Sequence, residues 1–255
     1  MLSEVETSRV VTFKPVPRDS STEPVLSKAE GLGMTIFAAL DVYHDHAPQS
    51  AAMNMAIDQA LLECATVPMI RFYRWQFPAL SFGYFGRFGD VACYQDKRDL
   101  VRRWTGGGIV FHGKDLTYSI VIPASDTIFT ESSISIYQKI HRALCDVLVD
   151  AGHAALLGTE TGVNDPSYNC FGNPVRADVI IDGRKVAGAG QRRTRRGLLQ
   201  QGSIQGVDVG NGLADRFAQV LSMNCVERKI DDHVLKRARE LAQQKYAAEI
   251  WLRKR

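Results

Sequence analysis

Two separate segments of the chain carry residue types that could bind an anion or an acyl group. The first, RRWTGGGIVFH (102–112), places two arginines before three glycines and a histidine after them. Three glycines remove every Cβ atom, so the backbone can approach a ligand closely and present its N–H groups. Arg102 or Arg103 could hold a phosphate or a carboxylate, and the apolar side chains after the glycines could form a wall. The candidate binding residues of this segment are Arg103, Gly106, Gly107, Gly108, Ile109, Val110, Phe111 and His112.

Each feature of this glycine segment also has a purely structural interpretation. A run of glycines often forms a tight turn between two strands, and a single histidine is often a hydrogen-bonded structural residue. The segment does not have the spacing GxxxxGK[ST] of a phosphate-binding loop or GxGxxG of a dinucleotide-binding turn. By itself it leaves the structural and the ligand-binding interpretations open.

The second segment, ADVIIDGRKVAGAGQRR (177–193), contains a lysine within a predicted hairpin. Strand alternation places Lys185 on one face with small residues, and Gly188 leaves room beside it for a bound chain. The lysine ammonium could hold a developing oxyanion or a phosphate. Cys170 lies upstream in the polar segment SYNCFGNP, and a nearby lysine would lower the pKa of its thiol and make it nucleophilic. A solvated hairpin lysine and a loop cysteine without a role are the alternatives.

Composition and cysteine usage exclude several classes of protein. The chain has 255 residues, of which 45% are hydrophobic and 23% charged, as in ordinary globular proteins. Its five cysteines are widely spaced and form no CxxC pair, which argues against a disulfide framework and a structural zinc site, so we expect no metal. No apolar run approaches the length of a membrane span, and the N-terminal residues do not have the order of a signal peptide. The sequence therefore predicts a cytoplasmic protein without a membrane partner.

Basic residues gather in one stretch, although the net charge of +3 is too small to indicate nucleic-acid binding by itself. The stretch 184–196 contains Arg184, Lys185, Arg192, Arg193, Arg195 and Arg196. Such a patch suits an acidic partner or a phosphate, and a solvated hairpin face is the alternative. A nucleic-acid module is disfavoured because aromatic residues are not interleaved with these arginines.

Hydrophobic periodicity predicts the elements that must position these residues. Residues 50–65 are expected to form a helix capped by Ser50, and residues 132–152 a helix that ends at Gly152. Asp182-Gly183 is a strong hairpin signal between two strand halves. Strands are predicted over 34–43, 69–75, 79–85, 99–104, 116–123 and 198–206, and two further helices near 213–222 and 231–252.

This order of elements favours an α+β fold, with a mixed or antiparallel sheet and surrounding helices. Hairpins and helices are mixed without the regular βαβ alternation of a doubly wound sheet. Residues 1–33 are polar and contain three prolines, so we expect a loosely ordered N-terminal segment. Residues 34–255 are predicted to form a single catalytic domain.

Taken together, four segments resemble the catalytic domain of the biotin/lipoate protein ligase and octanoyltransferase family. RRWTGGGIVFHGKDLTYSIVIP is similar to the RR-x-[ST]-GGG-x-V-x-H segment of that family, and ADVIIDGRKVAGAGQRR to its lysine-bearing hairpin. NMAIDQALL resembles the family's N-terminal helix, and IRFYRWQFPALSFGYF its next strands. The similarity covers most of residues 50–206. Trp104, Gln59 and Gln201 depart from the residues expected at their positions.

The resemblance implies an α+β catalytic domain like that of biotin ligases and class II aminoacyl-tRNA synthetases. The implied ligand is an octanoyl or lipoyl group, or its adenylate, and the acceptor is a lysine of a lipoyl domain. That domain would be of the glycine-cleavage H protein or 2-oxoacid dehydrogenase E2 type. Arg103, the stretch 108–111 and Lys185 take ligand-binding positions, and His112 matches the motif histidine.

Two chemistries occur in the family that the sequence resembles. One octanoyltransferase branch uses a cysteine in a CF-x-x-P motif placed fifteen residues before the lysine, and Cys170 in CFGNP has that spacing from Lys185. This match favours Cys170 as a nucleophile, with acyl carrier protein as a possible donor and no cofactor. The alternative is a lipoate ligase that uses ATP and Mg²⁺, in which Lys185 would contact an acyl-adenylate.

Overall fold

A mixed eight-stranded sheet forms the centre of the protein, in the order β11-β1-β2-β6-β10-β9-β8-β7. The computed structural model describes residues 35–158, 176–208, 210 and 212–254. β1 pairs in parallel with β2 and β11, and the other neighbours are antiparallel. The strands are β1 (Leu40–His44), β2 (Met69–Tyr73), β6 (Leu116–Pro123), β7 (Ala155–Leu157), β8 (Val179–Ile181), β9 (Arg184–Arg193), β10 (Gly197–Ile204) and β11 (Cys225–Arg228).

A second, three-stranded sheet carries the glycine segment. It consists of β3 (Ala79–Phe82), β4 (Asp99–Arg102) and β5 (Ile109–His112), in the order β4-β3-β5. Between β3 and β4 the chain makes two short 3₁₀ turns, Phe88–Asp90 and Ala92–Tyr94. A further 3₁₀ turn, Thr127–Thr130, follows β6.

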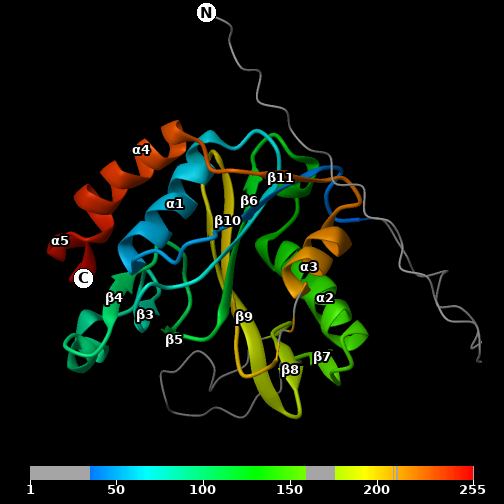
Figure 1. Ribbon diagram of the computed structural model, residues 1–255, viewed down its shortest axis with the longest axis horizontal. Helices are drawn as coiled ribbons and strands as arrows, with labels where there is room; N and C mark the ends of the chain where they lie inside the picture. The colour runs from blue at the N-terminus through cyan, green and yellow to red at the C-terminus, as the bar shows by residue number, and fades with distance from the viewer. Residues whose placement is uncertain (1–34, 159–175, 209, 211, 255) are drawn as a thin grey trace, which may run out of the picture.

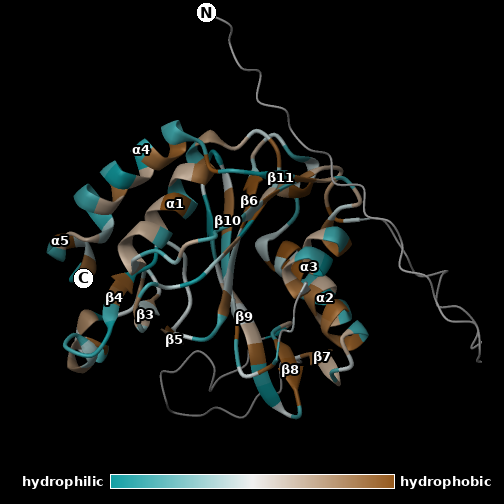
Figure 2. Cartoon of the chain, viewed as in Figure 1, coloured by the Kyte–Doolittle hydropathy of each residue, from teal (hydrophilic) through white to brown (hydrophobic). Residues whose placement is uncertain are grey.

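Helices cover both faces of the large sheet. α2 (Ser133–Asp150) and α3 (Leu213–Leu221) lie together on one side, and α1 (Ala51–Cys64) and α4 (Asp232–Leu241) lie on the other (Figure 1). Along both helix pairs, hydrophobic and hydrophilic residues alternate in the way expected of half-buried helices (Figure 2). Among the helices that the structure describes, none is long and apolar enough to cross a membrane.

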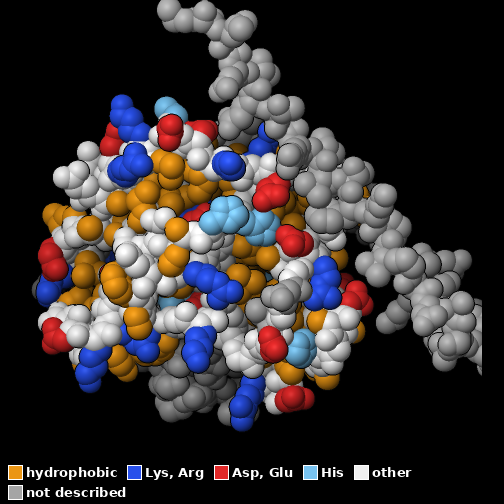
Figure 3. All heavy atoms as spheres, in the orientation of Figure 1, with side chains coloured by type: hydrophobic (Ala, Val, Ile, Leu, Met, Phe, Trp, Pro, Cys, Tyr) orange, Lys and Arg blue, Asp and Glu red, His pale blue; other side chains and the backbone are white. Residues whose placement is uncertain are grey.

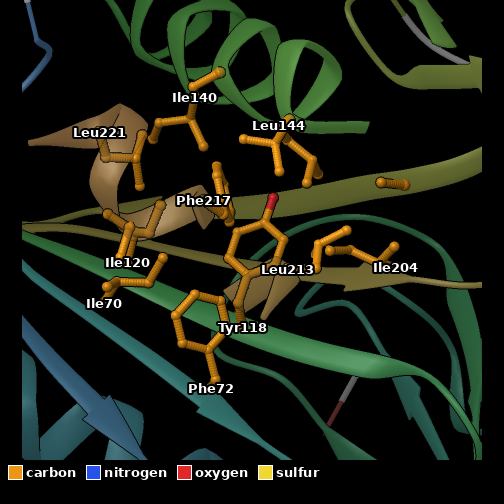
Figure 4. Packing of buried hydrophobic residues seen from close by; sticks show 14 of the residues in the cluster. Ile70, Phe72, Tyr118, Ile120, Ile140, Leu144, Ile204, Leu213, Phe217 and Leu221 are labelled. Carbon is orange, nitrogen blue, oxygen red and sulfur yellow. The ribbon is translucent and has the colours of Figure 1, made fainter. Parts of the chain in front are cut away.

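Strand alternation divides the core into two clusters, one on each face of the sheet. On β6, Tyr118 and Ile120 point to the cluster under α2 and α3, whereas Val121 belongs to the cluster under α1 and α4. Figure 4 shows the first cluster, in which Tyr118 lies among Phe217, Ile140 and their neighbours. The same alternation leaves the α1 face of β6 and β10 polar near the small sheet, where the candidate site lies.

Most of the expected elements are confirmed. Ser50 caps α1 by accepting the Met53 N–H, and Gly152 follows α2 with a φ of +91°. Asp182 and Gly183 form the hairpin turn, with φ values of +49° and +74° as a type I′ turn requires. The expected α+β class with a mixed sheet is therefore confirmed.

Four details differ from the sequence-based expectation. β1 begins at Leu40 and not at residue 34, and the short strands β7 and β11 were not predicted. The expected helix 231–252 is divided into α4, a π-helical turn (Ala242–Tyr246) and α5 (Glu249–Leu252). The predicted N-terminal segment lies outside the described residues, so the division at residue 34 stays a prediction.

Arg102 anchors this C-terminal segment and is not available for a ligand. Its guanidinium is buried and donates to the carbonyl oxygens of Trp251, Leu252 and Lys254, at 2.6–3.3 Å. It also donates to the carbonyls of Tyr84 and Gly86. Of the two arginines before the glycines, Arg103 is therefore the one that remains a candidate for substrate binding.

Candidate functional site

A narrow cleft between the two sheets contains most of the predicted site residues. The enclosed free space within it is small, about 30 Å³. Met55, which is unbranched and flexible, lies in its wall. The lining residues include Met55, Trp75, Ser81, Arg103, Gly107, Val110, His112, Thr117, Lys185, Gly188, Gly190, Gln201 and Ser203.

Lys185 forms one wall of the cleft and is held by an ion pair. Its Nζ atom lies 2.8 Å from Oδ2 of Asp178, and the two side chains are 2% and 0% exposed. Tyr137 of α2 donates its hydroxyl to Oδ1 of the same carboxylate at 2.5 Å, and the Ala189 N–H donates to this hydroxyl at 3.1 Å. Burial and the neighbouring Asp178 charge raise the pKa of Tyr137, so its hydroxyl remains a donor. A solvated hairpin lysine is therefore ruled out.

Gly188 provides the space that Lys185 occupies. A Cβ atom at position 188 would lie 2.3 Å from Cε and 2.6 Å from Nζ of Lys185. The pairing of β8 with β9 shifts by one residue between Val179 and Ile180, so that Val186 and Ala187 both enter the core under α2. The strict alternation expected of this hairpin is therefore interrupted, and Lys185 reaches the cleft by lying across Gly188.

The glycine loop is a crossing and not a tight turn between neighbouring strands. It joins β4 to β5, and β3 lies between these two strands, so the loop must pass the end of β3. There a Cβ atom on Gly83 would lie 2.0 Å from the carbonyl oxygen of Gly107, and one on Gly190 would lie 2.3 Å from that of Gly106. Gly107 itself has a φ of +96°, which favours glycine. Close approach of three chain segments therefore requires glycine at positions 83 and 190, and the backbone conformation favours it at position 107.

The carbonyl groups of this loop hold Arg103. Its Nη2 atom donates to the carbonyl oxygens of Gly106 and Gly108, at 3.2 and 2.9 Å, and its Nη1 atom donates to the Ser81 hydroxyl at 2.6 Å. The Gly106 N–H donates to the carbonyl of Gln191 on β9. At this glycine the expectation of an N–H presented to a ligand is therefore wrong, because the N–H ties the loop to the neighbouring strand.

His112 connects the arginine to a buried carboxylate through Ser81. The Ser81 hydroxyl lies 2.7 Å from Nε2 of His112, and Nδ1 of His112 lies 2.7 Å from Oδ2 of Asp115. The imidazole also stacks on Trp75, with ring centroids 4.0 Å apart. We call the chain Arg103–Ser81–His112–Asp115 the serine–histidine relay.

The protonation of the relay follows from burial and hydrogen bonding. Burial lowers the pKa of His112 more than Asp115 raises it, so the imidazole is neutral at pH 7. Burial opposes ionisation of Asp115, but bonds from His112, the Gly113 N–H and Ser203 outweigh it and lower its pKa to about 2. Nδ1–H then donates to Asp115, Nε2 accepts the Ser81 hydroxyl, and that oxygen accepts from Arg103. Every hydrogen bond of the relay is thus donated in the same direction, from Arg103 toward Asp115.

A second buried network holds the loop from the side of α1. Asp58 accepts from Arg71, Tyr73 and Ser119 and also from the Gln201 amide, at 2.6–3.1 Å. The carbonyl of Gln201 in turn accepts the hydroxyl of Thr105, the residue before the three glycines, at 2.8 Å. Gln201, which departs from the residue expected there, therefore links helix α1 to the glycine loop.

The structure brings together some of the predicted site residues and separates others. Arg103, Gly107, Val110, His112, Lys185 and Gly188 all line the cleft. Ile109 and Phe111 point to the opposite face of β5, where they pack with Leu80, Phe82 and Val91. Of the three residues expected to form an apolar wall, Val110 alone does so, because side chains alternate along a strand. Gly106 and Gly108 act through their carbonyl bonds to Arg103.

Sequence reasoning missed four residues that position the site: Ser81, Asp115, Tyr137 and Asp178. Asp115, Thr117 and Ser119 alternate within an otherwise apolar strand, a pattern that could have indicated a polar strip facing the cleft. Asp178 lies before the Asp182-Gly183 turn of the same hairpin and could have been considered as the partner of Lys185. Cys170 lies outside the described residues, so its predicted position opposite Lys185 stays a prediction.

The fold and the cleft define an α+β domain that holds a buried lysine and an arginine in the walls of one cleft. Solved structures share this fold. A lipoate-protein ligase A bound with ATP superposes with a TM-score of 0.67 at 22% identity, covering 85% of this chain and 98% of that one. The putative lipoate protein ligase Ta0514 from T. acidophilum, with bound lipoic acid, gives 0.67 at 24% identity, covering 84% and 98%.

The sequence comparison gives the family. Residues 50–244 match the lipoyl protein ligase A/B catalytic domain, and the chain belongs to this family. It is 38% identical over 175 residues to the octanoyltransferase LipM of Oceanobacillus iheyensis, a match that covers 63% of this chain and 62% of the relative. The LipM protein of Carboxydothermus hydrogenoformans is 36% identical over 194 residues, covering 72% and 70%. The chain thus matches a little under two thirds of the first relative's length.

Proposed function

We propose that this protein transfers an octanoyl or lipoyl group from a thioester to a lysine of a lipoyl domain, through a thioester on Cys170. The observation that carries the proposal is the placement of Lys185, buried in the cleft beside the glycine loop and held by Asp178. The names of the relatives and the spacing of CFGNP from this lysine favour the transferase over the ligase. No cofactor is needed for this reaction, and the cytoplasmic location stays a prediction.

In the first step, the Cys170 thiolate attacks the carbonyl carbon of the acyl thioester. The carbonyl π electrons move to oxygen, and a tetrahedral oxyanion forms. Lys185, held at this position by Asp178, has an ammonium that can donate an N–H to this oxyanion. Collapse expels the donor thiolate, which takes a proton from solvent, and leaves the acyl group on Cys170.

In the second step, the neutral amine of the acceptor lysine attacks the Cys170 thioester. The C–S bond breaks, an amide forms, and the proton lost by the amine nitrogen balances the charge of the released thiolate. The acceptor would be a lipoyl domain of the H-protein or E2 type, and the donor an acyl carrier protein. Arg103, fixed by the serine–histidine relay, would orient the polar end of the acyl group from the opposite wall.

Transfer without ATP tests this proposal. The purified protein is incubated with an apo lipoyl domain and octanoyl-carrier protein, and the acceptor is weighed by mass spectrometry. We expect acceptor acylation with the wild type and none above background with Cys170→Ala. Cys93→Ala, which removes an exposed cysteine, serves as the matched control and should keep wild-type activity.

Two results would contradict the proposal. Full transfer by Cys170→Ala would exclude a thioester on this residue, and among the described residues no cysteine lines the cleft to take its place. Acylation that requires lipoate and ATP, with no reaction from the carrier thioester, would instead indicate an adenylate-forming ligase. Trapping a mass increase of one acyl group on the wild type, lost in Cys170→Ala, would identify the intermediate directly.

A further inference from the structure

Three cations lie over aromatic rings beside the cleft and have no part in the transfer described above. Lys245 Nζ lies 4.4 Å from the ring centroid of Trp104 and 4.2 Å from that of Trp251. Arg192 Cζ lies 5.3 Å from the Trp104 centroid. Lys254 Nζ lies 5.4 Å from that of Trp251. We call Arg192, Lys245 and Lys254 the cation cluster.

The positive charge of the cation cluster is not balanced by carboxylates in the described part of the chain, where none of the three makes an ion pair. Lys245 donates to the amide oxygen of Gln59, and Lys254 donates to the Tyr84 hydroxyl. The Nε atom of Arg192 is buried and has no hydrogen-bond partner. Burial and the charges of Arg192 and Lys254 lower the pKa of Lys245 to about 8, against a smaller opposing effect of Glu63. A bound anion would offset this repulsion.

The basic residues of the stretch 184–196 do not lie together in the structure, and Arg192 is separated from the other arginines. Arg193 donates to carbonyls before α2, and Arg196 donates to the carbonyl of Glu63, so the arginines do not form one patch. On the face seen in Figure 3, basic and acidic side chains are interspersed. Arg192 is the arginine of this stretch that lies over Trp104, the residue at the start of the glycine loop.

Strand β9 connects the cation cluster to the cleft. Gly188, Gly190 and Arg192 are two residues apart and therefore share one face of the strand. Gly188 and Gly190 line the cleft beside Lys185, and Arg192 follows about 7 Å beyond Gly190 along the same face. The Gly106 carbonyl lies against Gly190 on this face, so the cation cluster lies beyond the glycine loop as seen from Lys185. A ligand whose reacting end lies at Lys185 would reach the cation cluster with its distal part by extending over the glycine loop.

We propose that the cation cluster binds the phosphate of a phosphopantetheine-type acyl thioester whose acyl group occupies the cleft. This inference rests on the proposed function, since it names the arm of the donor. Arg192 and Lys245 are half-buried between rings, so a slender anionic arm can reach them more readily than carboxylates on a flat protein surface. Phosphate oxygens also accept charge-assisted bonds from several cations at once.

Two donors that differ in a single phosphate test the proposal. Transfer to an apo lipoyl domain is measured with octanoyl-4′-phosphopantetheine and with octanoyl-pantetheine, and the ratio of their kcat/KM values is the readout. We expect the wild type to prefer the phosphorylated donor at least about tenfold. Arg192→Gln and Lys254→Gln should bring the ratio close to one. Lys245→Gln is a third variant, and Arg195→Gln, an exposed arginine of the same stretch, should keep the wild-type ratio.

Other results would overturn the inference. They are an equal use of both donors by the wild type, an equal loss on both donors in the variants, or a variant defect confined to the KM for the lipoyl domain. The last result would make the cation cluster an acceptor-docking surface. With octanoyl-carrier protein as the donor, comparison of kcat/KM between the wild type and the variants then shows whether the cation cluster also acts when the phosphate is part of a carrier.

A binding measurement separates this inference from the proposed function. Trp104 and Trp251 lie in contact with the cations, so tryptophan fluorescence should report phosphopantetheine binding. If phosphopantetheine binds at least tenfold more tightly than pantetheine, and Arg192→Gln removes the difference, the anion site stands even when no acyl transfer occurs. If transfer occurs but neither titration nor kinetics distinguishes the two compounds, the anion site is refuted and the transferase is not.

Discussion

The two walls of the cleft hold a cation in different ways. On the β9 wall, Lys185 is fixed by direct contact with the carboxylate of Asp178 at 2.8 Å. On the small-sheet wall, Arg103 bonds to the neutral oxygens of Ser81, Gly106 and Gly108, and the nearest carboxylate of its relay, Asp115, acts through His112. A buried histidine supports each wall: His112 on one side and His141, bonded to the Ala177 carbonyl beside Asp178, on the other.

This difference separates the roles of the two cations. An ion pair fixes the position of Lys185 and compensates its charge locally, which suits a group that must stabilise charge only when an oxyanion appears. The relay orients the Arg103 guanidinium, whose planar donors suit an anionic or strongly polar ligand group. We therefore expect changes on the β9 wall to lower kcat, and changes on the small-sheet wall to raise KM.

The largest effect is expected from Lys185→Met, which keeps the aliphatic length and removes the charge. Loss of one oxyanion donor should lower kcat by about 10²–10³-fold, with a small change in KM. Steady-state transfer kinetics with the octanoyl donor measure this. Arg184→Met changes the exposed neighbour on the same hairpin and should have wild-type kinetics. A Lys185→Met enzyme with an unchanged kcat would show that the β9 wall has no catalytic part.

A smaller effect is expected when the relay on the opposite wall is broken. Ser81→Ala removes the hydroxyl that accepts from Arg103 at 2.6 Å and bonds His112 at 2.7 Å. Because Arg103 then loses one of its orienting acceptors, we expect the KM for the acyl donor to rise about tenfold while kcat changes less. Ser133→Ala, at the start of α2, is the matched control. A fall in kcat without a change in KM would assign the relay to the chemical step.

The two walls also differ in how far the sequence could predict them. The hairpin that carries Lys185 is a local structure, so Asp182-Gly183 and the alternating residues around it were sufficient to place it. The small sheet depends on pairing that brings β3 between β4 and β5, which no local pattern encodes. For the same reason the glycine loop was not expected to be a crossing, and Gly83 was not expected to lie against it.

The partners of the predicted site residues illustrate the same limit. Ser81 and His112 are 31 positions apart in the chain, and Tyr137 and Asp178 are 41 apart. Their types are common, and only the packing of two sheets and α2 brings them to the cleft. Motifs thus located Arg103, His112 and Lys185, while the residues that orient them required the tertiary structure.

The smallest expected effect concerns stability and distinguishes the two buried histidines. Burial lowers the pKa of His141 to about 4, although the Ala177 carbonyl opposes this, whereas an unfolded histidine has a pKa of about 6.5. Between these values the unfolded state binds more protons, so His141 contributes stability above pH 6.5 that is lost as the pH falls toward 4. The free energy of unfolding of the wild type should therefore fall more steeply on acidification than that of His141→Gln, by up to about 1.4 kcal/mol per pH unit.

Urea unfolding at pH 7, 6 and 5, followed by tryptophan fluorescence, measures this slope, which does not depend on any constant loss of stability caused by the substitution. His233→Gln, at an exposed position of α4, should keep the wild-type slope. If His141→Gln and the wild type lose stability in parallel, the pKa of His141 is the same in the folded and unfolded states, and the lowering of its pKa by burial is refuted. His112, whose pKa is lowered in the same direction, should then be the histidine responsible for any remaining slope near pH 6.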